Sequence, residues 1–351
     1  MTISLDATYS LDRTPSGVAL YSREILFGLA RQHPEIKFQF CYRPHRFFDS
    51  FDAALPANAR RGLLAEPWGP RRAGLFHGLN QRLPKIPLRL AVATFHDLFV
   101  LTGEYSTPEF RARFARQARD AAVRSDAIVA VSEFTRRQAI SLLGVAADKV
   151  RVIHHGARPL EFPACPREKV ILSVGALQTR KNILRLVEAF ESVAADWRLV
   201  LSGSAGYGAD RIFDRIRRSP ARERIVLAGY TTPVELAAWY ARASVFAFPS
   251  LDEGFGMPVL EAMAAGTPVL TSNRSALPEV AGDAALLVNP EDTDELAREL
   301  AEITTNEDLR QDLARRGLER VKAFRWEAAV RRTWELYAEL LGWPYPLEQC
   351  G

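Results

Sequence analysis

The feature that most constrains the fold is a regular alternation of strand-like and helix-like runs, which is interrupted once and then begins again. Such alternation favours parallel sheets built from βαβ units. The strand-like runs of the first half occupy 3–9, 37–43, 74–78, 90–98, 127–132 and 150–156, and its helical patterns occupy 17–31, 108–124 and 133–143.

The second series of strand-like runs occupies 170–177, 198–204, 225–231, 243–250, 267–272 and 284–290, and three helical stretches close the chain at 293–304, 306–323 and 326–341. A segment at 157–168 with three prolines separates the two series, as is typical of an interdomain linker. The length of 351 residues also suits two cores better than one. We therefore predict two doubly wound domains, at 1–160 and 168–325, with ligands at the carboxyl ends of the strands.

Composition narrows the class of protein. Apolar content near half and charged content near a quarter are those of a globular protein, and no apolar run reaches the roughly 18 residues that span a bilayer. The first residues lack the pattern of a signal peptide. Three scattered cysteines (Cys41, Cys165 and Cys350) form neither a metal spacing nor a disulfide framework. We expect a cytoplasmic protein.

The net charge of +4 conceals an asymmetry. Residues 1–160 carry 23 Lys and Arg against 14 Asp and Glu, whereas the rest of the chain carries 23 against 28. A basic half attracts anionic partners, but no nucleic-acid module is recognisable, so we expect no nucleic-acid partner. An anionic membrane surface, a phosphate-bearing acceptor and a merely solvated arginine-rich surface all remain open.

The segment 248–270 carries the most specific chemistry. A buried strand ends at Ser250, a glycine-containing loop follows, and Pro258 stands where a helix begins. The unpaired N–H groups of such a helix start suit a diphosphate. Glu253 in the loop and Glu261 in the helix place carboxylates beside the same ligand, where each can accept hydrogen bonds from paired sugar hydroxyls.

The spacing E-GFGMPVL-E, followed by EAMAAGTPV, resembles the E-x7-E motif of the family 4 glycosyltransferases. These retaining enzymes have the GT-B fold, in which two Rossmann-like domains face a central cleft, and we expect the C-terminal helix (326–345) to return to the first domain. The resemblance implies that Glu253 faces the transferred sugar and that Glu261 holds the ribose. It places the loop and helix start around the donor through Gly254, Phe255, Gly256, Met257, Pro258 and Val259.

Other segments match the same family. In VGALQTRKNI, the adjacent cations Arg180 and Lys181 precede a helix, and an anion should compensate them. The resemblance implies that they clamp the donor diphosphate. It also implies nucleotide contacts by Gly203 and Tyr230, and a phosphate contact by Gly17, although the family's loop at this last place is richer in glycine.

Two histidines end strands of the first domain. His96 in TFHD matches the family histidine that faces the donor sugar, and a neutral imidazole can donate to a hydroxyl or a phosphate oxygen. His77 in LFHGLN is a candidate for shaping the acceptor pocket, with a purely structural role as an equal alternative. By contrast, Asp292-Thr293-Asp294 imitates a metal-binding D-x-D motif, but Glu295 three residues after Asp292 indicates a helix cap. We predict no metal site and no cofactor.

The implied activity is retaining, metal-independent transfer of a hexose from a nucleotide sugar. GALQTRKN and SALPEVAGDA resemble bacterial mannosyltransferases of surface-polysaccharide assembly, so GDP-mannose is the first expectation for the donor and a UDP-hexose the second. The expected acceptor is a saccharide or a polyprenol-diphosphate-linked saccharide. The resemblance implies that the first domain (1–160) binds the acceptor and the second (168–325) binds the nucleotide sugar. Three alternatives remain: a nucleotide-sugar epimerase, a disaccharide phosphorylase, and a catalytically silent carbohydrate-binding or assembly subunit.

A basic helix at 108–126 has two interpretations. Its arginines lie beside Phe110 and Phe114, as in a helix that docks on anionic lipid. Such docking would make the protein peripheral on the inner face of the membrane. Alternatively, the aromatic rings pack inward and the arginines are simply solvated.

Overall fold

The computed structural model describes residues 1–12, 16–70 and 72–343, and the chain divides into two compact units. Unit 1 comprises Met1–Leu101, Arg111–Gly156 and the chain from Arg325 onward. Unit 2 comprises Thr102–Phe110 and Ala157–Phe324. Within the described residues, no helix combines the length and the apolar character that crossing a bilayer requires.

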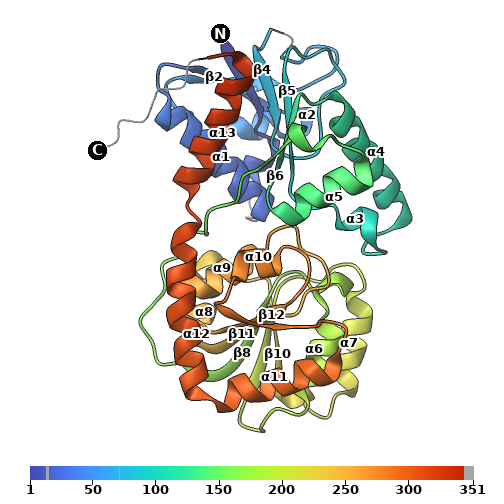
Figure 1. Ribbon diagram of the computed structural model, residues 1–351, viewed down its shortest axis with the longest axis vertical. Helices are drawn as coiled ribbons and strands as arrows, with labels where there is room; N and C mark the ends of the chain where they lie inside the picture. The colour runs from blue at the N-terminus through green and yellow to red at the C-terminus, as the bar shows by residue number, and fades with distance from the viewer. Residues whose placement is uncertain (13–15, 71, 344–351) are drawn as a thin grey trace. The chain divides into compact units, whose positions relative to one another are not determined.

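Unit 1 is built on a parallel sheet in the order β3-β2-β1-β4-β5-β6-β7 (Figure 1). Its register pairs Leu5 with Phe40 and Ile3 with Leu75. The strands are β1 (Thr2–Asp6), β2 (Lys37–Tyr42), β3 (Ala59–Leu63), β4 (Leu75–Gly78), β5 (Ala91–Phe95), β6 (Ala127–Ala130) and β7 (Val150–Val152). The sequence analysis missed β3 because its residues ARRGL show no apolar alternation, which an edge strand does not need.

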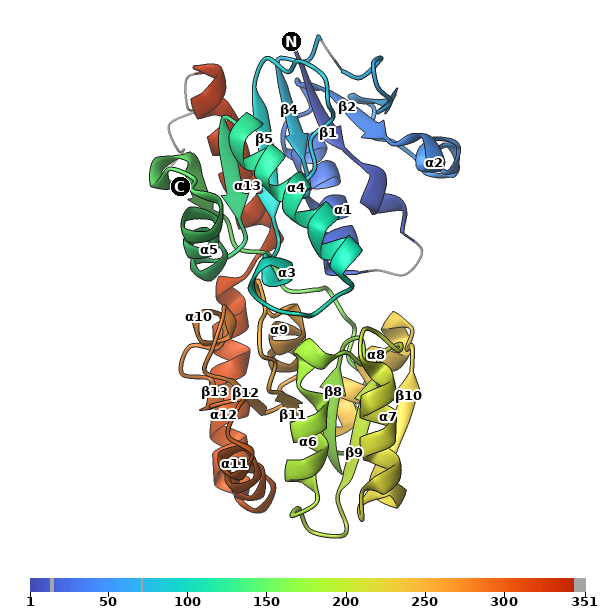
Figure 2. The same ribbon diagram turned by 90° about the vertical axis from the view of Figure 1, so that its right-hand side faces the viewer.

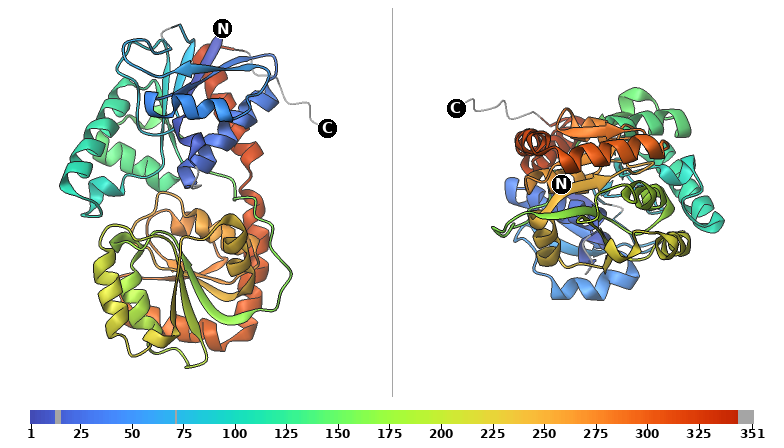
Figure 3. Two further views of the ribbon diagram at one scale, coloured as in Figure 1. Left: turned by 180° about the vertical axis from the view of Figure 1, so that it is seen from behind. Right: turned by 90° about the horizontal axis from the view of Figure 1, so that it is seen from below.

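Helices cover both faces of this sheet. On one face, α1 (Gly17–Gln32) packs against α13 (Trp326–Leu341) (Figure 3). The two helices are so close that a Cβ at Gly28 would lie 2.4 Å from Val330 Cγ2. The expectation that the last helix belongs to the first domain is therefore confirmed. On the other face lie α4 (Pro108–Arg124) and α5 (Glu133–Leu143) (Figure 2). Phe114 of α4 and Ala139 of α5 are buried in one core with residues of the sheet. Short elements connect these parts: η1 (Thr8–Leu11), α2 (Pro44–Phe47), η2 (Phe48–Asp52), α3 (Phe99–Thr102) and η3 (Ala147–Lys149).

Unit 2 repeats the design with a parallel sheet in the order β10-β9-β8-β11-β12-β13. The strands are β8 (Glu168–Val174), β9 (Arg198–Ser202), β10 (Ile225–Gly229), β11 (Ala243–Phe248), β12 (Val269–Ser272) and β13 (Ala285–Val288). The order reverses between β8 and β11, and that switch point is where doubly wound sheets bind ligands. The predicted pair of Rossmann-like domains is confirmed.

Two layers of helices enclose the second sheet (Figure 1). The first layer contains α6 (Ile183–Phe190), α7 (Ala209–Arg218) and α11 (Thr293–Thr305), whose apolar faces form one core with the sheet. The second contains α8 (Pro233–Arg242), α9 (Met257–Ala264), α10 (Leu277–Ala281) and α12 (Glu307–Arg320). Single 3-10 turns complete the unit: η4 (Thr179–Lys181), η5 (Arg222–Arg224) and η6 (Val321–Ala323).

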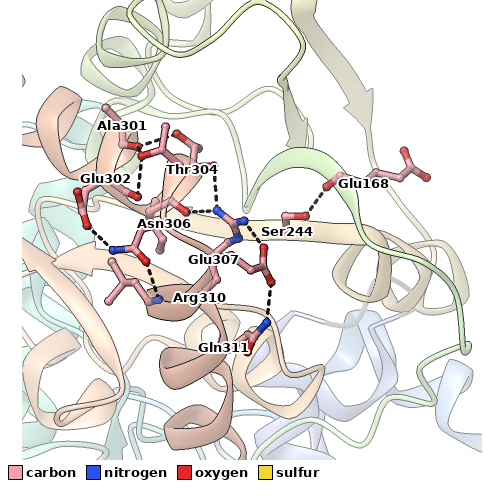
Figure 4. Close-up of polar contacts among 12 residues, drawn as sticks. Glu168, Ser244, Ala301, Glu302, Thr304, Asn306, Glu307, Arg310 and Gln311 are labelled. Atoms are coloured by element: carbon pink, nitrogen blue, oxygen red, sulfur yellow. Dashed lines mark hydrogen bonds and ion pairs between the residues drawn. The ribbon is translucent and has the colours of Figure 1, made fainter.

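The junction of α11 and α12 shows how local chemistry separates two helices (Figure 4). Asn306 caps α12, because its Oδ1 accepts a hydrogen bond of 3.0 Å from the backbone N–H of Leu309. Arg310 donates to the carbonyl oxygens of Ile303 and Thr304, which are orphaned at the end of α11. The end of one helix is thus satisfied by a side chain of the next.

Candidate active site

The loop between β11 and α9 forms the centre of the candidate site in unit 2. Gly256 has a φ of 105°, and a Cβ there would lie 2.6 Å from Leu277 Cδ2, so only glycine fits. Pro258 stands in the first turn of α9, as predicted. The loop is held against α10 by a hydrogen bond of 3.2 Å from the N–H of Ala276 to the carbonyl oxygen of Glu253.

Glu253 forms a buried ion cluster with the two adjacent cations. Its Oε1 lies 2.8 Å from a terminal nitrogen of Arg180 and 2.5 Å from Lys181 Nζ. Lys181 Nζ also lies 4.5 Å from the centre of the Phe248 ring, at the end of β11. The anion that the sequence analysis required beside Arg180 and Lys181 is therefore, in this structure, Glu253.

The electrostatics of this cluster fix the charge of Glu253. Burial alone would raise the pKa of its carboxyl, but the charges of Arg180 and Lys181 outweigh burial and lower that pKa to about 2. Glu253 is therefore ionised at neutral pH and has no proton to give. The cluster of two cations and one carboxylate carries a net charge of +1, which suits an arriving diphosphate.

Backbone geometry holds the cations in place. Arg180 and Lys181 lie in η4, and Asn182 then adopts a left-handed conformation with φ 59° before α6 begins. The Asn182 side-chain amide donates to the carbonyl oxygens of Pro249 and Pro290, at 3.1 and 2.6 Å. The carbonyl oxygen of Arg180 in turn accepts from the N–H of Leu251 at 2.9 Å. The cation loop and the Glu253 loop are thereby locked together.

Glu261 is held differently, by two partners that the sequence analysis did not find. Arg158 Nε lies 2.7 Å from one oxygen of the Glu261 carboxylate, and the Tyr240 hydroxyl donates to the other at 2.8 Å. Glu261 is 2% exposed, and Tyr240 is fully buried. Each carboxylate oxygen retains a further lone pair, so these contacts orient Glu261 without exhausting its capacity to accept hydrogen bonds from a ribose.

His96 lies at the carboxyl end of β5 in unit 1. Its Nε2–H donates to the carbonyl oxygen of Leu79 at 2.9 Å, and its ring stacks on His155. Burial lowers the pKa of His96 to about 4, so the imidazole is neutral at physiological pH. Since Nε2–H is occupied, the nitrogen left for a ligand is Nδ1, which accepts a hydrogen bond rather than donating one.

His77 lies in the core of unit 1. It has no exposed surface, and its two ring nitrogens lie 2.5 Å from the Tyr337 hydroxyl and 2.8 Å from Thr94 Oγ1. Burial lowers the pKa of His77 to about 3. Of its two interpretations, this geometry favours the structural one, because it ties α13 to the sheet and offers no free nitrogen to an acceptor.

The predicted glycine and tyrosine contacts fall at loops after strands. Gly17 is the exposed first residue of α1, with Ser16 as the N-cap, while Arg13–Pro15 of the same loop lie outside the described residues. A Cβ at Gly203 would lie 2.0 Å from the carbonyl oxygen of Gly175, so close packing alone requires glycine at this position. Tyr230, after β10, is half exposed. Their contacts with a nucleotide stay predictions.

The side chains around the start of α9 divide into two groups. Phe255, Met257 and Val259 are buried, and Phe255 packs edge-on against Phe324, so they shape the loop from within. Gly254 lies in the loop before α9 and Pro258 in the first turn of that helix, and both line this segment with main-chain atoms rather than polar side chains. What this segment can present to a phosphate is therefore main-chain N–H rather than side chains.

The D-x-D sequence is a helix cap, as predicted. Asp292 Oδ1 accepts from the N–H of Glu295 at 2.9 Å at the start of α11. Among the described residues, no group of three or more His, Cys, Asp or Glu side chains is arranged to hold a metal ion.

Comparison with known proteins places this arrangement in a family. Residues 39–159 match the model described as Glycosyltransferase Family 4, and residues 162–320 match that of Glycosyl transferases group 1. The O-antigen chain mannosyltransferase B of Escherichia coli is 32% identical over 281 residues, which cover 75% of this chain and 74% of that protein. The chain belongs to the family 4 glycosyltransferases.

Two further comparisons concern a longer relative and a solved structure. The serotype-specific mannosyltransferase WbdA of Escherichia coli is 29% identical over 71% of this glycosyltransferase, which spans 33% of that longer protein. The sucrose-phosphate synthase of Thermosynechococcus elongatus superimposes with a TM-score of 0.80 over 97% of this chain and 99% of that one, at 23% identity. The latter likeness concerns the fold.

Several groups around the candidate site were not expected from the sequence. Arg158 stands in the proline-containing linker and Tyr240 at the end of α8, far from Glu261 along the chain. Thr102 donates to Asp252, the neighbour of Glu253, at 2.9 Å. None of these residues forms a local motif, so only the tertiary contacts reveal them.

Proposed function

We propose that this glycosyltransferase transfers mannose from GDP-mannose to a saccharide or polyprenol-diphosphate-linked acceptor in polysaccharide assembly, with retention of the anomeric configuration and without a metal ion. The donor assignment is supported by the names of the two Escherichia coli relatives, both mannosyltransferases. A UDP-hexose is the second candidate donor. The observation that carries the proposal is the buried cluster of Arg180, Lys181 and Glu253, because it provides charge compensation for a diphosphate leaving group.

The proposed chemistry is the same-face displacement that the resemblance to the family implies, and the charges of this cluster support it. The bond between sugar C1 and the diphosphate breaks, and the nucleoside diphosphate departs with developing negative charge that Arg180 and Lys181 stabilise. The acceptor oxygen bonds to C1 on the same face, and its proton passes to the departing phosphate oxygen. As the resemblance to the family implies, Glu253 supports the positive charge on the sugar rather than acting as the nucleophile that retaining glycosidases use, and the two cations hold its carboxylate through Oε1.

Two fixed cations also support metal independence. In metal-dependent transfer a divalent ion neutralises the diphosphate, whereas Arg180 and Lys181 supply two permanent charges at the place where that charge develops. Transfer by the protein should therefore persist in excess EDTA. Loss of transfer in EDTA, restored by Mg²⁺ or Mn²⁺, would contradict this part of the proposal.

The decisive experiment is a screen of nucleotide sugars for hydrolysis and transfer by the purified protein. GDP-mannose should be consumed fastest, and NMR of the product should show that the new linkage has the anomeric configuration of the donor. Epimerised donor would identify an epimerase instead, and a sugar phosphate formed with inorganic phosphate as acceptor would identify a phosphorylase. If calorimetry detects no binding of a donor, the protein is instead a catalytically silent carbohydrate-binding or assembly subunit.

We propose that any membrane association, at the cytoplasmic face, is mainly electrostatic. Of the two aromatic residues of α4, Phe114 is buried in the core of unit 1, whereas Phe110 is 38% exposed, so only the Phe110 ring is available to contact lipid. Arg113, Arg116 and Arg119 are exposed and recur at a spacing of three along the helix. Binding to anionic liposomes should therefore occur at low salt, disappear at high salt and be lost in a variant with all three arginines changed to serine.

A further inference from the structure

Unit 1 contains a cavity of about 380 Å³ at the carboxyl ends of β1 and β2. Its lining comes from η1, α1 and the segment α2–η2, which follows β2 directly. Its volume is in the range of small-molecule sites, about 300–1,000 Å³. It also occupies the sheet edge at which doubly wound domains bind their ligands.

The polar wall of this cavity is fixed in place by its arginines. Arg46 donates to Asp12 at 2.8 Å and to Asp49 at 3.2 Å. Arg23 donates to the carbonyl oxygens of Ser10 and Asp12, at 2.7 and 2.8 Å. The guanidinium groups are therefore engaged in holding the wall, and the carboxylate of Asp49 is oriented by one of them.

The remaining lining offers acceptors and apolar surface. Asp52 is exposed at the cavity and has no side-chain partner among residues 1–12, 16–70 and 72–343. Phe27, half-buried, lines the cavity together with the buried Tyr42. Carboxylate oxygens suit paired hydroxyls, and aromatic carbon suits the C–H face of a sugar ring.

The charge of the lining selects the kind of ligand. Among the described residues, Arg23 and Arg46 are matched by Asp49 and Asp52, and the carboxylate of Asp12, 2.8 Å from Arg46, adds a further negative charge to the wall. With both arginines already engaged, a phosphate would meet the carboxylates and be repelled. A neutral polyhydroxyl ligand has no such penalty.

We infer that this cavity binds a neutral hexose unit of the saccharide acceptor, with Asp49 and Asp52 accepting hydrogen bonds from its hydroxyls. The inference rests on the proposed function and names the acceptor subsite that His77, buried in the core, does not provide. It also implies recognition of the sugar part of an acceptor rather than of a lipid diphosphate.

The test is direct binding of α-linked mannotriose to the full-length protein, measured by saturation-transfer NMR and titrated to a dissociation constant. Asp52→Ala should weaken binding about tenfold or more, as expected for the loss of a hydrogen bond to a charged group. Asp49→Asn should weaken binding in the same direction. Asp148→Ala, an exposed carboxylate in η3 before the opposite edge strand β7, is the matched control and should bind as the wild type does.

The outcomes separate this inference from the proposed function. Wild-type binding that Asp52→Ala loses while the variant unfolds at the same Tm as the wild type, and that Asp148→Ala retains, supports the subsite. No binding by the wild type, or equal binding by wild type and Asp52→Ala, overturns it even if GDP-mannose is hydrolysed. Failure of the wild type to consume any nucleotide sugar refutes the proposed function alone, because mannotriose binding is measured without a donor.

Discussion

Replacing Lys181 with methionine tests the role of the cation cluster most directly. Methionine keeps an unbranched stem next to Phe248 but removes the charge that lies 2.5 Å from Glu253 Oε1. Arg180 remains 2.8 Å from the same oxygen, so the buried carboxylate keeps a charged partner. The fold should therefore survive the change.

The expected effects on stability and on rate differ in size. Loss of one hydrogen bond between charged groups should lower the free energy of unfolding by about 1.5–3 kcal/mol. Loss of a charged donor aimed at the departing diphosphate should lower kcat by about 10²–10³, which corresponds to roughly 2.7–4 kcal/mol of transition-state stabilisation. The variant should be a folded protein with very slow turnover.

The assay compares initial rates of nucleoside diphosphate release, at saturating donor, with urea unfolding of the same preparations. Lys169→Met is the control, because Lys169 is an exposed lysine of unit 2 paired with Asp196 on the surface, and its loss should leave kcat unchanged. The reasoning is refuted if Lys181→Met is folded and retains a kcat within threefold of that of the wild type.

Three further predictions address the surroundings of the cluster. Glu253→Gln leaves Arg180 and Lys181 buried without their anion, so the free energy of unfolding should fall by about 3–5 kcal/mol. Nucleoside diphosphate should raise the Tm of this variant more than that of the wild type. Equal Tm values of variant and wild type without ligand would contradict this prediction. Glu261→Gln should raise the KM for the donor about tenfold while changing kcat less, because it weakens a ground-state contact with the ribose; an unchanged KM would remove that role. The pKa of His77 is about 3 in the folded protein against 6.5 in the unfolded chain, so the unfolded state binds the extra proton. The contribution of His77 to stability is therefore full above pH 6.5 and falls by about 1.4 kcal/mol per pH unit as the pH drops from 6.5 towards 3. His77→Gln should reduce by one the number of protons taken up on unfolding at pH 5, and an identical pH profile for variant and wild type would show that another group is responsible.

The sequence by itself determined the two-domain α/β architecture, because the pattern that specifies it is local. Alternating apolar runs and the Asp292 cap each act within a few residues, and the helices they predict are present. The loop before α9 was also readable, since Gly256 and Pro258 have conformational reasons that depend mainly on their own backbone.

Only the tertiary structure decided which charges meet. The residues of the Lys181–Glu253 pair are 72 positions apart, and Arg158 reaches Glu261 from the linker. The sequence predicts the same position, the carboxyl end of a strand, for His77 and His96. In the structure, however, His77 is enclosed by Tyr337 and Thr94, whereas the ring of His96 stacks on His155. Sequence periodicity assigns a residue to an element and a face, whereas burial and partner choice depend on which distant elements pack there, so local patterns do not contain them.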